Sequence, residues 1–148
     1  MPERATSARE RRLVIERAGG RCEYCLSPFD YCPDPFAVEH IVPRSRGGSH
    51  RPVNLAYSCQ GCNSYKYTST GAVDPVSGER VPLYHPRQHA WRDHFAWNED
   101  FTEIVGLTPT GRATIACLDL NRPNVVNLRR LLAGVNQHPP KETLPQEL

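Results

Sequence analysis

The sequence contains no long apolar run, and its first residues are polar and rich in arginine. A helix that spans a bilayer needs roughly 18 or more apolar residues in succession, and a secretory signal also needs an apolar stretch. We therefore expect a cytoplasmic protein with no membrane partner. Thiols stay reduced in that compartment, so cysteines there are more often metal ligands than disulfides.

Hydrophobic residues are also scarce, at 39% of the 148 residues, whereas prolines number 14 and glycines 10. This composition predicts much irregular backbone around a small core. A core of that size gains stability from a bound metal or another cross-link. The composition therefore favours a fold that contains such a cross-link.

Lysine is nearly absent, because only two of the 18 basic residues are lysines and the others are arginines. The net charge of +2 does not by itself indicate a nucleic-acid partner. The positive excess lies in residues 1–66, which carry ten Lys and Arg against seven Asp and Glu. Arginine suits bidentate phosphate contact, although a solvated surface explains the same charge equally well.

Six cysteines are present, and four of them follow the pattern Cys22-x2-Cys25-x33-Cys59-x2-Cys62. Two Cys-x-x-Cys pairs supply the four thiolates of a tetrahedral structural zinc site. A redox dithiol is the alternative, but two matched pairs outside a βαβ unit favour zinc. Cys32 and Cys117 have no such pairing and are expected to be ordinary small residues.

Local patterns in the first half predict a helix followed by two strands and a second helix. Ser7 and Glu10 have the spacing of a capping box, so we expect a helix over residues 8–18. Glycines follow that helix and would end it. Apolar residues and prolines then predict a strand at 36–42 and a helix at 61–67. The short apolar segment 53–57 between them is either a returning strand or irregular.

The second half has weaker patterns. Residues 68–90 resemble a linker with turn signals, although 81–83 can form a brief strand. Further elements are expected at 101–107 (strand), 112–118 and 123–132 (helices), with Trp91 and Trp97 in the core. The chain would thus divide into a core at 1–67, an extension packed on it at 68–133 and a flexible tail at 134–148.

Residues between and beside the cysteine pairs suit phosphodiester hydrolysis. His40 can act as a base, because histidine titrates near neutral pH. Glu39 offers a carboxylate and Asn63 an amide oxygen to a divalent cation such as Mg²⁺ or Mn²⁺. Neighbouring side chains on a strand point to opposite sides. Glu39 and His40 can therefore share a site only if the backbone bends or Glu39 reaches round.

These residues resemble the HNH endonuclease family over roughly residues 8–67. The resemblance rests on Glu39-His40-Ile41-Val42-Pro43 with its glycine turn, on Asn54-Leu55, and on Cys59-x-x-Cys62-Asn63. It implies an α+β fold, in which a small ββα-metal motif is stapled by a four-cysteine zinc site and carries an N-terminal helix and a C-terminal α/β extension. It also implies that His40 is the general base, that Glu39 and Asn63 bind the catalytic cation, and that Asn54 braces the loop.

The sequence departs from the common family pattern at two of these positions. Asn63 stands where histidine is frequent, a variant that the family also uses, and Glu39 stands where aspartate is common. Glutamate is longer by one methylene, so the geometry of the metal site can differ.

We therefore expect a metal-dependent endonuclease acting on DNA, most simply double-stranded, with structural Zn²⁺ and catalytic Mg²⁺ or Mn²⁺. The alternative is a zinc-stabilised nucleic-acid-binding module without catalysis, which would not need Glu39, His40 or Asn63. The expected phosphate contacts are Arg44, Arg46, Arg51 and Lys66. The other histidines, His50, His85, His89 and His94, are expected to be structural or on the surface. No dimer signature is evident.

Overall fold

A computed structural model describes residues 6–145 of the chain. The chain divides into two compact units, Met1–Thr70 and Gly71–Leu148, which are described separately below. Within the described residues, no helix has the length and apolar character that crossing a membrane requires.

The first unit begins with helix α1, Ala8–Arg17, as the capping-box pattern predicts. The Ser7 hydroxyl accepts from the Glu10 amide, and the Glu10 carboxylate accepts from the Ser7 amide. After the helix, Gly19 and Gly20 have φ of +64° and +72°. Only glycine adopts such angles at little cost, so this turn can deliver the chain directly to Cys22.

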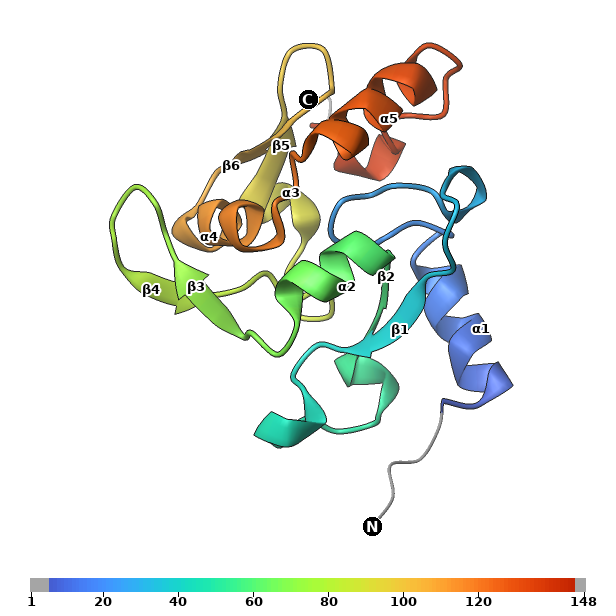
Figure 1. The fold of residues 1–148 in the computed structure, drawn as a ribbon, viewed down its shortest axis with the longest axis vertical. Helices are drawn as coiled ribbons and strands as arrows, with labels where there is room; N and C mark the ends of the chain where they lie inside the picture. The colour runs from blue at the N-terminus through green and yellow to red at the C-terminus, as the bar shows by residue number, and fades with distance from the viewer. Residues whose placement is uncertain (1–5, 146–148) are drawn as a thin grey trace. The chain divides into compact units, whose positions relative to one another are not determined.

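A ββα unit follows, which confirms the predicted α+β fold. Strands β1 (Ala37–His40) and β2 (Leu55–Ser58) pair antiparallel with His40 opposite Leu55. Helix α2, Gln60–Lys66, starts directly after β2 and contacts β1, while α1 packs beside β2 (Figure 1). Single turns of 3₁₀ helix lie at Phe29–Tyr31, Arg44–Arg46 and Pro52–Asn54.

The second unit holds two short hairpins and three helices. Its elements are β3 (Gly71–Val73), β4 (Arg80–Pro82), α3 (Trp91–His94), β5 (Phe95–Trp97), β6 (Ile104–Gly106), α4 (Pro109–Leu118) and α5 (Pro123–Ala133). Strands β3 and β4 pair antiparallel, as do β5 and β6, and α4 contacts β3, β4 and β6. The core contains Leu83, Tyr84, Trp91, Phe95 and Leu118.

The structure differs from the expected organisation in two places. Residues 68–90, expected to be a linker-like loop, contain the β3–β4 hairpin, and the predicted turn signals form its turn. Part of the segment expected to be a flexible tail lies within the second unit. There the Trp97 indole donates to the Thr143 hydroxyl over 2.8 Å, and the side chain of His138 contacts the carbonyl of Phe101.

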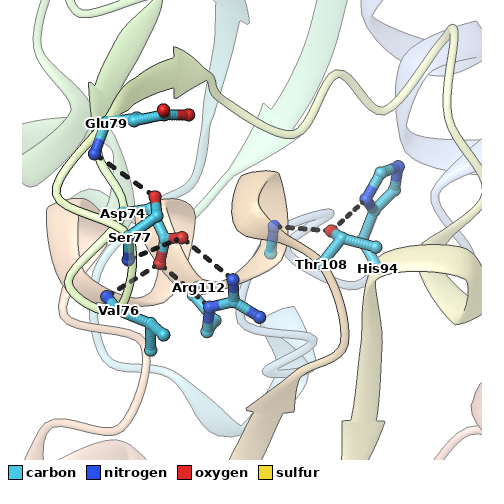
Figure 2. A network of polar contacts seen from close by, with 8 residues as sticks. Asp74, Val76, Ser77, Glu79, His94, Thr108 and Arg112 are labelled. Atoms are coloured by element: carbon cyan, nitrogen blue, oxygen red, sulfur yellow. Dashed lines mark hydrogen bonds and ion pairs between the residues drawn. The ribbon is translucent and has the colours of Figure 1, made fainter.

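A buried carboxylate, Asp74, ties the β3–β4 turn to α4 (Figure 2). Its oxygens accept from the amides of Val76 and Ser77 and from the Nε and Nη2 of Arg112, both at 2.9 Å. The Arg112 hydrogen bonds, followed by those of the two amides, lower the pKa of Asp74 far below its ordinary value against the opposing effect of burial. Charge-assisted bidentate contacts of this kind favour the ionised carboxylate.

A second polar contact fixes the start of α4 (Figure 2). The Thr108 hydroxyl caps the helix by accepting from the Gly111 amide at 3.0 Å. It also lies 2.6 Å from Nδ1 of His94. His94 thus has a structural contact in the second unit, as does Trp91, whose ring packs against Phe95.

We predict that Asp74→Asn lowers the melting temperature at pH 7, because the neutral amide cannot replace an ionised bidentate partner of Arg112. The lowered pKa stabilises the fold above the ordinary aspartate pKa of about 4, and this stabilisation is lost as pH falls further. The melting-temperature gap between wild type and Asp74→Asn should therefore narrow from about pH 4 downward. Thermal melts between neutral pH and pH 3 measure this gap, with Glu79→Gln in the same hairpin as control. A gap that stays constant with pH would contradict this role of Asp74.

Candidate metal centre and active site

Four buried thiols converge where the turn after α1 meets the start of α2. Their sulfur atoms all lie within 4.8 Å of one another, and they belong to Cys22, Cys25, Cys59 and Cys62. The sulfurs of Cys25 and Cys59 are 3.7 Å apart. Tetrahedral zinc with Zn–S bonds of ~2.3 Å separates its sulfurs by about 3.8 Å. The donor set and its spacing therefore fit a four-thiolate metal site.

The four buried thiols shift one another's pKa values. Burial, followed by hydrogen bonds with the other three thiols, raises the pKa of Cys22 well above its ordinary value. Hydrogen bonds from Cys22 and the other two thiols lower the pKa of Cys25. A divalent metal bound by the four sulfurs would neutralise the thiolates directly.

A pocket of about 370 Å³ lies beside β1 in the same unit. It is lined by Ala37, Val38, Glu39, His40, Pro43, Arg44, Ser45, Asn63 and Tyr67. The structure thus brings the three residues predicted to act in catalysis, Glu39, His40 and Asn63, to one pocket.

His40 is the last residue of β1 and is half-buried. Its Nε2 lies 2.9 Å from Nδ1 of His50, which belongs to the loop between the strands. The contact restricts the rotation of the His40 ring. His50 is expected from the sequence to be structural or on the surface. The number of residues between His40 and His50 does not predict that their rings touch. The bond depends on how the loop folds back.

Glu39 precedes His40 on β1, and its side chain is 5% exposed. Its oxygens accept from the Tyr24 hydroxyl and lie 3.3 Å from the Lys66 ammonium. Burial raises the pKa of Glu39 although the charge of Lys66 and the Tyr24 hydrogen bond both act to lower it. The contact of Tyr24 with Glu39 is not among the sequence predictions. Its position between Cys22 and Cys25 does indicate that Tyr24 lies close to the metal site.

Lys66 requires a correction. Its position one turn after Asn63 predicts a phosphate contact, but its side chain is 1% exposed. Its ammonium donates to the carbonyl of Ile41 at 2.8 Å besides pairing with Glu39. Lys66 lies on the face of α2 that is turned toward β1, so it holds helix and strand together and is not available to a phosphate.

Asn63 lies in α2 and is half-buried. Its backbone carbonyl accepts from the amide of Tyr67 at 2.9 Å, while the residue lines the pocket. Asn63 thus belongs to the same pocket as His40, on the helix that begins at the thiol cluster.

Asn54 bridges the two ends of the loop between the strands. Its Oδ1 accepts from the Val42 amide at 2.9 Å, and its Nδ2 donates to the carbonyls of Val42 and Ser49 at 2.9 and 2.7 Å. Gly48 is required here, because a Cβ atom would lie 1.7 Å from the Val42 carbonyl oxygen. These contacts set the path of the chain directly after His40.

The three arginines predicted to contact phosphate are all exposed on this loop. Arg44 lines the pocket. Arg46 donates from Nε to the carbonyl of Thr68 at 2.8 Å, which ties the loop to the segment after α2. Arg51 is not among the residues that line the pocket.

The family comparison agrees with this geometry. Residues 22–69 match the family model of HNH endonucleases, and the four cysteines in this range fit the zinc-binding subgroup of that family. The match supports a nuclease-type function in general. No curated protein and no solved structure matches the chain.

We predict that Cys59→Ser prevents stable folding of the first unit. Structural zinc contributes on the order of 10 kcal/mol to the folding of small zinc peptides, and a hydroxyl is a much weaker zinc ligand than a thiolate. Elemental analysis should find about one tightly held zinc per wild-type chain, and Cys59→Ser should be insoluble or lack a cooperative melt. Cys32→Ser, outside the cluster, serves as control. A zinc-free protein with the wild-type melt would contradict this prediction.

Proposed function

We propose that the protein is a metal-dependent endonuclease that hydrolyses phosphodiester bonds in DNA, with His40 as the general base. The observation that carries this proposal is that His40 and Asn63 line one pocket inside the residues that match the HNH endonucleases. A pocket of this kind holds the scissile phosphate between a base and oxygen ligands for a cation.

His40 accepts a proton from the attacking water. Its ring is held by His50 at 2.9 Å, so the imidazole does not need to be oriented during the reaction. His50 is a positioning residue in this scheme. It can also stabilise the proton that His40 gains, since the two rings share one hydrogen bond.

Glu39 and Asn63 are the proposed ligands of the catalytic Mg²⁺ or Mn²⁺. Both line the pocket, and carboxylate and amide oxygens are suitable donors for such hard cations. The bound cation would polarise the phosphate and stabilise the leaving oxygen. The carboxylate of Glu39 already pairs with Lys66, so it joins the cation only by sharing or exchanging that partner.

Arg44, which lines the pocket, would neutralise the phosphate there, and Arg46 and Arg51 would contact neighbouring phosphates. Arginine forms bidentate contacts with phosphate oxygens. We propose DNA as the partner, cut while in a duplex or at a defect in one. A cytoplasmic location, where the thiols stay reduced, is part of the same proposal.

The alternative function is a zinc-stabilised module that binds nucleic acid without cutting it. The Glu39–Lys66 ion pair favours this alternative, because a carboxylate neutralised by an ammonium is a weaker cation ligand. The two functions differ in whether His40 affects a reaction rate.

We predict that His40→Ala slows DNA cleavage by about 10²- to 10⁴-fold, the usual effect of removing a positioned general base. Affinity for DNA and the thermal melt should stay close to wild type, because the imidazole acts mainly in the transition state. Single-turnover cleavage across pH and Mg²⁺ concentration measures the rate.

Asn63→Ala provides the contrast. It weakens cation binding, so its activity should recover in part at high Mg²⁺, whereas His40→Ala should not recover. Folded His40→Ala that cuts at the wild-type rate would rule out the proposed mechanism.

Phosphate contact by the loop arginines predicts a salt-dependent affinity. Each phosphate neutralised adds roughly 0.9 to the slope of log affinity against log salt. Arg44→Ala with Arg46→Ala should make the slope shallower, which titrations without Mg²⁺ can measure at several salt concentrations. Arg9→Ala with Arg12→Ala, on the exposed face of α1, is the matched control. An unchanged slope in the loop variant would assign both loop arginines to solvent.

A further inference from the structure

Tyr67, at the C-terminal end of α2, is not explained by the chemistry proposed above. It lines the pocket together with His40, Arg44 and Asn63, yet the residue is 79% exposed. Aromatic rings of this size are usually covered in a folded protein. Here an exposed tyrosine belongs to a pocket that also holds a histidine, an arginine and an asparagine.

The backbone of Tyr67 has φ 47° and ψ −119°. A side chain with a Cβ atom rarely adopts a positive φ, and glycine or asparagine meets the same requirement at lower cost. The backbone conformation of this turn therefore does not explain why a tyrosine is present at position 67. Strained backbone of this kind is concentrated at ligand sites.

Contacts on both sides hold this backbone in place. The Tyr67 amide donates to the Asn63 carbonyl, and the preceding Lys66 is anchored by its buried ammonium to the carbonyl of Ile41. The carbonyl of the following residue, Thr68, accepts from Nε of Arg46. The backbone of Tyr67 is thus fixed between α2 and the loop that holds Arg46, although the Tyr67 side chain is exposed.

We infer that Tyr67 stacks on an unpaired base next to the phosphate held in the pocket, so that the preferred substrate is DNA with an unpaired nucleotide at the cleavage site. This inference rests on the proposed nuclease function and adds its substrate class. Arg44 in the same pocket supplies the positive charge that a phosphate requires. The ring beside it supplies the flat apolar surface that a base requires.

The inference favours an unpaired nucleotide for a geometric reason. In an intact duplex the faces of each base are covered by its neighbours, and only base edges reach the grooves. An aromatic platform outside the stack can contact a base face only if the base leaves the stack, and this costs least where the base is already unpaired. The same ring would gain little from a fully paired substrate.

The hydroxyl of Tyr67 offers a different contact, a hydrogen bond to a phosphate oxygen. The two contacts respond differently to substitution. Tyr67→Phe keeps the ring and removes the hydroxyl, whereas Tyr67→Ala removes both. Stacking predicts that Tyr67→Phe behaves as wild type, and a phosphate contact predicts that it behaves as Tyr67→Ala.

The test uses the full chain and three oligonucleotide duplexes of one sequence that differ only at one chosen site. One is fully paired, one carries a single unpaired nucleotide at the site, and one carries an abasic residue in place of that unpaired nucleotide. Affinity is measured by fluorescence anisotropy without Mg²⁺, and cleavage is measured separately with Mg²⁺. Tyr65→Ala, an exposed tyrosine of α2 outside the pocket, is the matched control.

Wild type, Tyr67→Phe and Tyr65→Ala should bind the duplex with the unpaired base roughly 5- to 150-fold more tightly than the abasic duplex, the range expected for one stacked base. Tyr67→Ala should bind the two alike. The losses of DNA affinity caused by removing the base and by removing the ring should therefore not be additive, as expected for two groups in direct contact.

Two results separate failure of this inference from failure of the nuclease function. If wild type cuts DNA but Tyr67→Ala keeps the preference for the unpaired base, the stacking contact is wrong and the nuclease stands. If the preference depends on Tyr67 but wild type cuts none of the duplexes, the base contact stands and the nuclease is wrong. A Tyr67→Phe variant that loses the preference would overturn stacking in favour of a hydroxyl contact.

Discussion

The four-thiol cluster is the constraint on which the first unit depends. Strands β1 and β2 have four residues each, and an isolated two-stranded hairpin is marginally stable at best in water. The cluster joins the turn before this hairpin to the helix after it, because Cys22 and Cys59 belong to the two ends of the enclosed segment. A metal held there fixes the start of α2, and with it the position of Asn63 relative to the end of β1.

A buried ion pair is the second link between the hairpin and α2. Glu39 and Lys66 connect β1 to α2 at 3.3 Å with almost no exposure to water. Buried charges are tolerated only when they are paired and hydrogen-bonded, and Tyr24 and the Ile41 carbonyl supply the additional bonds. His40 follows Glu39 on β1 and lines the pocket. If Glu39 binds the catalytic cation, it does so with the same carboxylate that pairs with Lys66 and links β1 to α2.

The sequence was sufficient for features set by local chemistry or by spacing. Helix α1, the hairpin, α2 and the convergence of four cysteines were all predictable, because capping, prolines and paired Cys-x-x-Cys motifs act over a few residues. The inward orientation of Lys66 was not predictable, since it depends on which face of α2 meets β1. The contact of His50 with His40 depends on the path of the loop, and the β3–β4 hairpin on pairing between strands of three residues each. The role inferred for Tyr67 was not predictable from the sequence, because its exposure and its positive φ are properties of the folded turn.

The central claim is that the pocket beside β1 cuts DNA in a cation-dependent reaction. Its most direct test uses zinc-loaded wild-type protein and supercoiled plasmid, with Mg²⁺ either absent or added, and follows the plasmid forms over time on a gel. The proposed function predicts that the plasmid stays supercoiled without Mg²⁺ and becomes nicked or linear once Mg²⁺ is added. Plasmid that is bound, as shown by a mobility shift, but stays supercoiled with Mg²⁺ and with Mn²⁺ would contradict the claim and leave a zinc-stabilised binding module.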